Sequence, residues 1–300
     1  MYIYVLYPTH LFSLRKISVL LLLYSVPLAL SGEDPMWYSA GAAGTGMGSV
    51  SATGSGFWSS FSNQALLTEN NSYSAGISFL SRFNIPELGT YSAGLILPAG
   101  KSTGGIMYYR FGYSEYKREK IGLACGMRMS EKISAGVQID YVAVRTSNKY
   151  IGAQSLTFET GLLIHASENV SVGIHLFNPV PNSLRKSFVP SSLSAGIETE
   201  LSRSLNAAAE LSMSSGSPLA IRLGFDYEAI NKLHIRGGFS TENTSFTFGT
   251  GFTWNSVIID LAFASHERLG ITTAASLIFI ISENREFAAA NSRNKFIAKY

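Results

Sequence analysis

The chain has 300 residues, of which 46% are hydrophobic and only 14% are charged, with a net charge of +3. A typical soluble protein has about 25% charged residues, while a mean hydropathy of +0.16 is too polar for a bundle of membrane helices. Disorder is excluded by the 15 Tyr, 18 Phe and 3 Trp residues and the low net charge. The basic residues are scattered, so no nucleic-acid partner is predicted. The single cysteine, Cys125, excludes an intramolecular disulfide framework and a Cys-based zinc site.

Residues 1–31 have the pattern of a secretory signal peptide. Arg15 and Lys16 precede an apolar run over 17–30, and Ala29-Leu30-Ser31 supplies the small residues of a cleavage site. The run of about 14 residues is short for a transmembrane helix, which needs roughly 20. We therefore predict an exported mature chain that starts near Gly32, with an uncleaved N-terminal anchor as the alternative.

Residues 73–281 alternate apolar and polar side chains in segments separated by turn residues. In 218–228, for example, Ile221 and Leu223 share one face while Arg222 lies on the other. The polar face is rich in Gly, Ser and Ala, no helical pattern intervenes, and the segments approach the roughly 9–11 residues of a membrane-crossing strand. Transmembrane barrels show this alternation. We predict an all-β fold, a transmembrane antiparallel β-barrel of about 14 strands, with about 12 as the alternative count, in the bacterial outer membrane.

Alternate connections between these segments differ in length. One set includes 81–88, 146–155 and 179–189, whereas the other includes 129–131 and 229–230. Outer-membrane barrels have long extracellular loops and short periplasmic turns, so both chain ends are expected on the periplasmic side. Aromatic residues near segment ends are expected to form girdles at the membrane interfaces: Tyr91, Tyr109, Phe158, Phe246, Phe252 and Trp254.

Residues 37–72 do not alternate, and we predict that 32–72 form a plug inside the barrel. The Gly-rich stretch 37–48 is expected to be extended, and the next stretch places Phe57, Phe61 and Ala65 on one face of a short amphipathic helix. A disordered periplasmic leader is the alternative, which the aromatic residues disfavour. The residues expected to anchor the plug are Trp37, Gly46, Gly48, Phe57, Trp58, Phe61 and Asn63.

Three short motifs carry a resemblance to a known family. They are Gly46-Met47-Gly48, Phe61-Ser62-Asn63-Gln64-Ala65, where members have Asn-Pro-Ala at the last three positions, and Phe177-Asn178-Pro179. With the long strand meander, the chain resembles the PorV/PorQ barrels, which are related to the FadL outer-membrane transporters. The resemblance covers 37–281 and implies a fourteen-stranded barrel with an N-terminal hatch. In PorV-like members it implies a role in type IX protein secretion, and in FadL-like members the passage of hydrophobic compounds.

Motifs for catalysis and metal binding fail when they are tested. Gly100-Lys101-Ser102 lies at the wrong spacing from Gly94 for a phosphate loop, and no helical pattern follows it. No nucleophile elbow, zinc-protease or calcium-loop pattern is present, and the His residues of the mature chain have no paired metal spacing. A barrel phospholipase would need Ser, His and a polar orienter on adjacent strands, and nothing favours it. We predict no enzyme activity, no cofactor and no metal.

Charged side chains on the Gly-, Ser- and Ala-rich face are predicted to face the lumen: Asp140, Glu159, His175, Glu198, Glu210, Arg222, Asp226, His234, Arg236 and Asp260. Hairpins closed through the shortest turns place three pairs directly opposite, with Arg236 diagonal to Asp226: Glu210 and Arg222, Asp226 and His234, and Glu159 and His175. These pairs either neutralise charge in a wet or plugged lumen or form a lining that contacts the plug or a passing solute.

Two functional classes fit such a barrel. The resemblance favours a shuttle or scaffold in type IX secretion, with outer-membrane lipid and secretion-system proteins or secreted cargo as partners. The long connection 179–189 is its candidate docking loop, through Pro179, Pro181, Arg185 and Lys186. The alternative is a FadL-like channel for a hydrophobic small molecule, in which the plug shifts or a lateral gap opens. A polar tail, 282–300, follows the last strand in either case.

Overall fold

The computed structural model describes residues 41–54, 56–147, 152–179, 189–242 and 245–283, which belong to the compact unit Glu33–Tyr300. The predicted signal peptide 1–31, the plug residue Trp37 and most of the tail 282–300 lie outside the described residues. So do Pro181, Arg185 and Lys186 of the candidate docking loop, whereas Pro179 is described.

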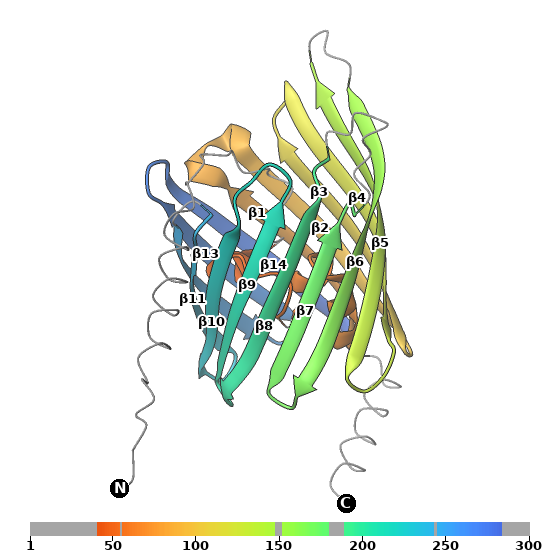
Figure 1. Cartoon of the computed structure of the whole chain (residues 1–300). Helices are drawn as coiled ribbons and strands as arrows, with labels where there is room; N and C mark the ends of the chain where they lie inside the picture. Colours follow the sequence, from red (N-terminus) through yellow and green to blue (C-terminus); the bar gives the residue numbers. More distant parts are fainter. Residues whose placement is uncertain (1–40, 55, 148–151, 180–188, 243–244, 284–300) are drawn as a thin grey trace, which may run out of the picture. The chain divides into compact units, whose positions relative to one another are not determined.

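The described strands form a closed antiparallel barrel in which each strand pairs with its neighbours in sequence and β1 pairs with β14 (Figure 1). The predicted all-β barrel is confirmed, with 14 strands rather than 12. The strands are β1 Ser72–Ser81, β2 Gly89–Ala99, β3 Ser102–Gly112, β4 Tyr116–Arg128, β5 Ile133–Thr146, β6 Ala153–Ser167, β7 Val170–Phe177, β8 Ser192–Ser202, β9 Leu205–Ser214, β10 Ala220–Ile230, β11 Leu233–Ser240, β12 Ser245–Trp254, β13 Val257–His266 and β14 Gly270–Glu283.

Apolar side chains cover the outside of the barrel because successive residues of a strand point to opposite faces. In β10, Leu223 and Phe225 are exposed, whereas the neighbouring Arg222 is 5% exposed and faces inward. Such a surface is stable only against lipid. Five of the six predicted girdle aromatics are also exposed, but Tyr109 is buried, because it shares the inner face of β3 with Met107.

The connections alternate in length around the barrel. The connection from β5 to β6 spans 147–152 and that from β7 to β8 spans 178–191, whereas the turns 168–169 and 231–232 join strands at the opposite end. We call these the long-loop end and the short-turn end. The alternation agrees with the predicted pattern, and the assignment of the long-loop end to the extracellular side stays a prediction.

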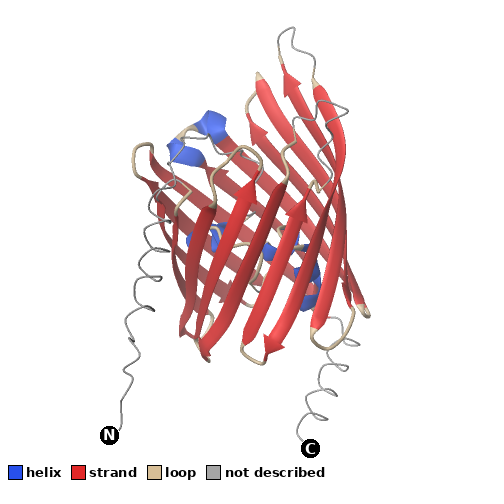
Figure 2. Ribbon diagram, in the orientation of Figure 1, coloured by secondary structure: helices blue, strands red, loops and turns tan. Residues whose placement is uncertain are grey.

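Residues 41–54 and 56–71 lie inside the barrel, and we call them the luminal segment (Figure 2). Its helices are short: α2 Ala42–Gly46, η2 Ser59–Phe61 and η3 Gln64–Glu69, with η4 Arg82–Asn84 and η5 Pro86–Leu88 in the connection between β1 and β2. Helix α2 contacts strands β11 to β14, and η3 contacts β3 to β6. No helix of the described residues is long and apolar enough to cross a membrane.

The expected secondary structure of this segment is therefore wrong in two places. The stretch expected to be extended contains α2, and the single amphipathic helix is replaced by two short 3₁₀ helices. Asn63 causes the interruption, because its backbone is extended (φ −140°, ψ 110°) and its side chain accepts a hydrogen bond from the Ala65 N–H. An asparagine that caps a helix in this way satisfies an end donor and stops the preceding helix from continuing.

Asn63 also ties the luminal segment together. Its Nδ2 donates to the Ala52 carbonyl oxygen at 2.7 Å and to that of Leu162 on β6 at 3.3 Å. We expect Asn63→Ala to lower the free energy of unfolding by about 1–2 kcal/mol, since both the cap and a buried hydrogen bond are lost. Urea unfolding in lipid vesicles measures this loss. Asn71→Ala, at an exposed position, is the matched control, and an equal shift in both variants would contradict the capping role.

Candidate functional site

A belt of inward-facing glycines brings the barrel wall against the luminal segment, at several positions against its backbone. A Cβ added at Gly173 would stand 1.9 Å from the Ala52 carbonyl oxygen, and one at Gly224 would stand 2.4 Å from that of Met47. Such approaches require glycine, because no side chain fits between the two backbones. We call this set the glycine belt: Gly76, Gly94, Gly105, Gly126, Gly136, Gly161, Gly173, Gly196, Gly224, Gly238 and Gly249.

The belt runs across neighbouring strands. Gly136 of β5 is paired in register with Gly126 of β4 on one side and with Gly161 of β6 on the other. On the other side of the barrel, Gly224 of β10 pairs with Gly238 of β11. The small residues of the polar face thus form a continuous seat for the luminal segment rather than a water-filled lining.

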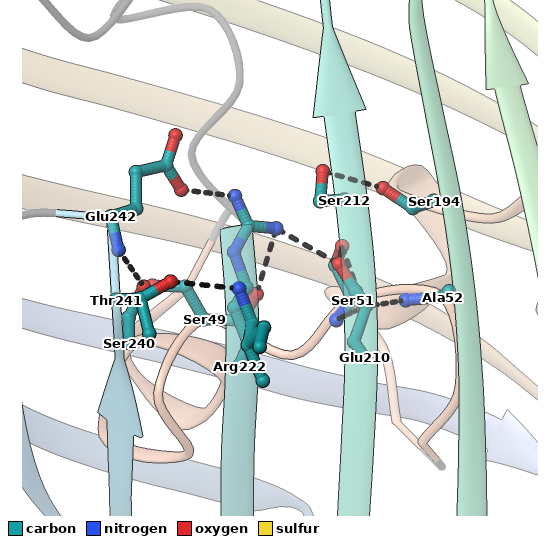
Figure 3. Close-up of polar contacts among 11 residues, drawn as sticks. Ser49, Ser51, Ala52, Ser194, Glu210, Ser212, Arg222, Ser240, Thr241 and Glu242 are labelled. Carbon is teal, nitrogen blue, oxygen red and sulfur yellow. Dashed lines mark hydrogen bonds and ion pairs between the residues drawn. The ribbon is translucent and has the colours of Figure 1, made fainter. Parts of the chain in front are cut away.

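The first charged cluster joins β9 and β10 to the luminal segment (Figure 3). Glu210 Oε2 accepts hydrogen bonds from the backbone N–H groups of Ser51 at 2.6 Å and Ala52 at 2.7 Å. Arg222 Nη1 donates to Glu210 Oε1 at 2.9 Å, and its Nη2 bonds Glu242. Glu210 and Arg222 are directly opposite in register, which confirms that predicted pair.

The second cluster is centred on Glu159 of β6, which is 1% exposed. Its carboxylate accepts from Lys120 Nζ and Gln64 Nε2, both at 2.8 Å, and from Gln138 Nε2 at 3.2 Å. His175 Nε2 lies 2.9 Å from it. Sequence reasoning missed Lys120, although its position on the inner face of β4 follows from alternation with the outward Ile121.

The third cluster lies on β10, β11 and β13. Arg236 donates from Nε to Asp226 at 2.8 Å and from Nη1 to Asp260 at 2.6 Å, and His234 Nδ1 lies 2.8 Å from Asp226. The guanidinium group therefore stands between two carboxylates, which compensates the cost of burying either charge alone.

The second and third clusters also bond the luminal segment. Glu159 holds Gln64, and Ser276 of β14 donates to Asp260 at 3.4 Å while accepting from the Ala42 N–H at 3.3 Å. All three clusters therefore neutralise buried charge and fasten residues 42–64 to the wall. The first and third clusters together hold the N-terminal half of the segment, and the second holds η3.

Two of the three predicted pairs are displaced by two residues. The structure pairs Glu159 with Phe177, Gly161 with His175, Asp226 with Arg236, and Glu228 with His234. The cause is an irregularity next to each turn, between His165 and Ser167 and between Glu228 and Ile230, which the shortest-turn assumption omits. A shift of two keeps each side chain on its face, so Glu159 still reaches His175 and Asp226 still reaches His234.

The remaining predicted residues lie as follows. Asp140 is fully buried and accepts from Gln138 Nε2 at 2.7 Å, whereas Glu198 is partly buried and bonded to the Gly54 backbone. Gly46 and Gly48 both bond Thr247: its hydroxyl donates to the Gly46 carbonyl and accepts from the Gly48 N–H, each at 2.9 Å. The rings of Phe57, Trp58 and Phe61 pack edge-on, with the Phe57 centroid 4.8 Å from Trp58 and 5.4 Å from Phe61.

A cavity of about 60 Å³ lies between the luminal segment and the long-loop end, and it is partly open to solvent. One part of its lining is apolar, from Phe61, Met107, Tyr109 and Phe177, and another part is hydroxyl-rich, from Ser192, Ser194, Ser212 and Ser214. Acidic and basic side chains of the first two clusters also line it: Lys120, Glu159, His175, Arg222 and Glu242. Within the part of the chain that is described, no group of three or more His, Cys, Asp or Glu side chains could hold a metal ion.

Comparison with known proteins finds similarity in three dimensions only. No family model matches the chain, and no curated protein matches it. Among solved structures, the toluene transporter TbuX of Ralstonia pickettii matches with a TM-score of 0.60 at 12% identity, covering 79% of this chain and 96% of TbuX. The CymD monoaromatic hydrocarbon channel gives 0.64 at 15% identity, covering 82% and 98%. A Pseudomonas aeruginosa FadL homologue gives 0.62 at 11% identity, covering 80% and 98%.

The chain has the fold of FadL-type outer-membrane barrels. That fold and the apolar outer surface indicate a location in the bacterial outer membrane. The proteins named above are transporters and channels rather than enzymes, at the level of fold. None of these comparisons supports the narrower resemblance to PorV/PorQ.

Proposed function

We propose that this protein is an outer-membrane channel for small hydrophobic molecules, which is the alternative of the two functions considered from the sequence. The observation that carries the proposal is the cavity on the long-loop side of the luminal segment, with aromatic side chains in its lining. The fold similarity to a toluene transporter and a monoaromatic hydrocarbon channel supports it. A scaffold role in type IX secretion has no comparable support.

In the described conformation the luminal segment is the barrier to passage. A barrel of this strand number has a lumen wide enough to need a gate, and here the glycine belt and the three clusters hold the segment across it. A solute in the cavity therefore moves on only when part of the segment leaves the wall. Its attachments include hydrogen bonds to wall side chains, such as those of Glu210 and Glu159, which other polar partners can replace as the segment moves.

A disulfide between the luminal segment and the wall tests this role. The Ala52 Cβ lies 3.4 Å from the position of a Cβ on Gly196 of β8, close to the ~3.8 Å mean of disulfides. With Cys125 replaced by alanine, we expect oxidised Ala52→Cys/Gly196→Cys barrels to reduce uptake of radiolabelled toluene by intact cells to that of cells lacking the barrel. Reduction with dithiothreitol should restore uptake.

The matched control is a disulfide within the wall. Ile106→Cys/Leu123→Cys joins directly paired residues of β3 and β4 whose side chains are exposed on the outside of the barrel. It leaves the luminal segment untouched and should keep uptake high in both redox states. Two results would oppose the proposal. One is wild-type uptake no faster than that of barrel-free cells, and the other is equal uptake by the oxidised and reduced locked barrel.

A further inference from the structure

We propose that the cavity selects neutral single-ring compounds that carry a hydroxyl group, such as phenols, over both unsubstituted hydrocarbons and ring carboxylates. This selectivity rests on the proposed channel function and names the substrate class of the same cavity. Three features of the cavity carry it: a hydroxyl pair with unused bonding capacity, charged side chains that are already paired, and a small volume.

The hydroxyl pair is formed by Ser194 of β8 and Ser212 of β9, which face each other in register with 3.0 Å between their oxygens. Each hydroxyl offers one donor and two lone pairs. After they bond each other, the two serines still have one O–H donor and three lone pairs between them. A phenolic hydroxyl both donates and accepts, and can therefore bond both serines. A methyl group in the same place can do neither.

The basic side chains of the lining are each engaged by a carboxylate. Lys120 Nζ lies 2.8 Å and His175 Nε2 lies 2.9 Å from Glu159, while Arg222 lies 2.9 Å from Glu210 and also bonds Glu242. A ligand carboxylate would have to displace one of these partners and then meet the displaced carboxylate in a site of low dielectric constant. Charge matching within the wall thus disfavours anions.

The size of the cavity limits the apolar part of the ligand. Its volume of about 60 Å³ is less than half that of the ~150 Å³ apolar cavity that holds benzene in another protein. The enclosed space beside Phe61 and Phe177 would therefore take only part of a ring, with the rest in the open mouth, whereas most of a long acyl chain would lie outside it. The aromatic side chains suit a ring edge or face.

Binding of three fluorinated ligands that differ in one substituent tests the selectivity. Fluorinated phenol, toluene and benzoate are titrated by fluorine NMR into barrels in lipid nanodiscs, and partitioning into empty nanodiscs is subtracted. We expect the phenol to bind about fivefold more tightly than the toluene, as one added neutral hydrogen bond predicts, and the benzoate to bind most weakly.

The double variant Ser194→Ala/Ser212→Ala should lower phenol affinity to that of toluene and leave toluene binding unchanged. Both partners of the hydroxyl bond are removed together, so folding should be little affected. Ser74→Ala/Ser78→Ala removes two other buried inward hydroxyls, on β1, and should change neither ligand.

Equal binding of phenol and toluene, or equal weakening of both by the double variant, would overturn the selectivity while leaving the channel function intact. Tightest binding of benzoate would overturn the argument from matched charges. If none of the three ligands binds above the nanodisc background, both the selectivity and the proposed channel function are contradicted.

Discussion

Replacing Gly173 by alanine is expected to detach the luminal segment locally and to accelerate labelling of a cysteine buried within it. The new methyl group would lie 1.9 Å from the Ala52 carbonyl oxygen and 2.7 Å from its carbon. Both atoms belong to backbone, so neither can rotate away as a flexible side chain would. The same backbone carries Ala52 N, which bonds Glu210 at 2.7 Å, so a shift that relieves the clash also strains this hydrogen bond.

Ser60→Cys in a Cys125→Ala background reports the detachment. Ser60 is fully buried, and cysteine replaces it with little change in shape, so a maleimide reacts only when the segment opens. Overpacking by one methyl group costs about 1–3 kcal/mol, which corresponds to a labelling rate about 5- to 150-fold higher. Gly104→Ala is the control, since its new Cβ would meet only the Leu97 oxygen at 3.8 Å. Equal rates in the two variants would show that the belt does not seat the segment.

The barrel itself follows from the sequence because lipid imposes a strict rule. Outward positions that face the lipid chains must be apolar and every backbone group there must be bonded within the sheet, so the period of two survives along the membrane-crossing part of each strand. In β10 the alternation of Arg222 with the outward Leu223 predicts the observed faces. The pairing of Glu210 with Arg222 can also be predicted from the sequence, because β9 and β10 pair without an irregularity next to the turn that joins them.

The two-residue shifts in strand register and the contacts of the luminal segment cannot be predicted from the alternation of residues along a strand. An irregular residue at the β6–β7 turn moves Glu159 opposite Phe177 instead of His175, and turn residues alone do not specify it. From the strand pattern alone, a glycine such as Gly173 cannot be told from any other small residue of the polar face. Glycine is needed there because of the contact with Ala52, which lies more than a hundred residues earlier. A glycine at a similar height on strand after strand is the signal that identifies such a seat in a sequence.

Glu210→Ala is expected to be the most damaging change in the charged clusters. It removes the acceptor for two backbone N–H groups, at Ser51 and Ala52, and one carboxylate partner of Arg222, whose side chain is 6% exposed. Breaking a buried ion pair from one side costs about 3–5 kcal/mol, because the remaining charge and donors lose their partner without gaining water. Urea unfolding in lipid vesicles should show a loss of this size. Glu119→Ala, which breaks an ion pair with Arg145 (70% exposed) at 3.2 Å, should cost about 1 kcal/mol or less.

The double variant Glu210→Ala/Arg222→Met separates the two parts of the loss. If the stranded cation dominates, the double variant recovers much of the stability that Glu210→Ala loses, because a buried pair can be exchanged for apolar groups at little cost. If the loss comes mainly from the N–H groups of Ser51 and Ala52, the double variant stays unstable and the cysteine at position 60 is still labelled fast. Without Glu210, these two donors find a new partner, water, only when the luminal segment opens. A Glu210→Ala barrel as stable as the wild type and equally protected at position 60 would contradict the view that this carboxylate fastens the luminal segment to the wall. In that case the glycine belt alone would have to hold the barrier in place.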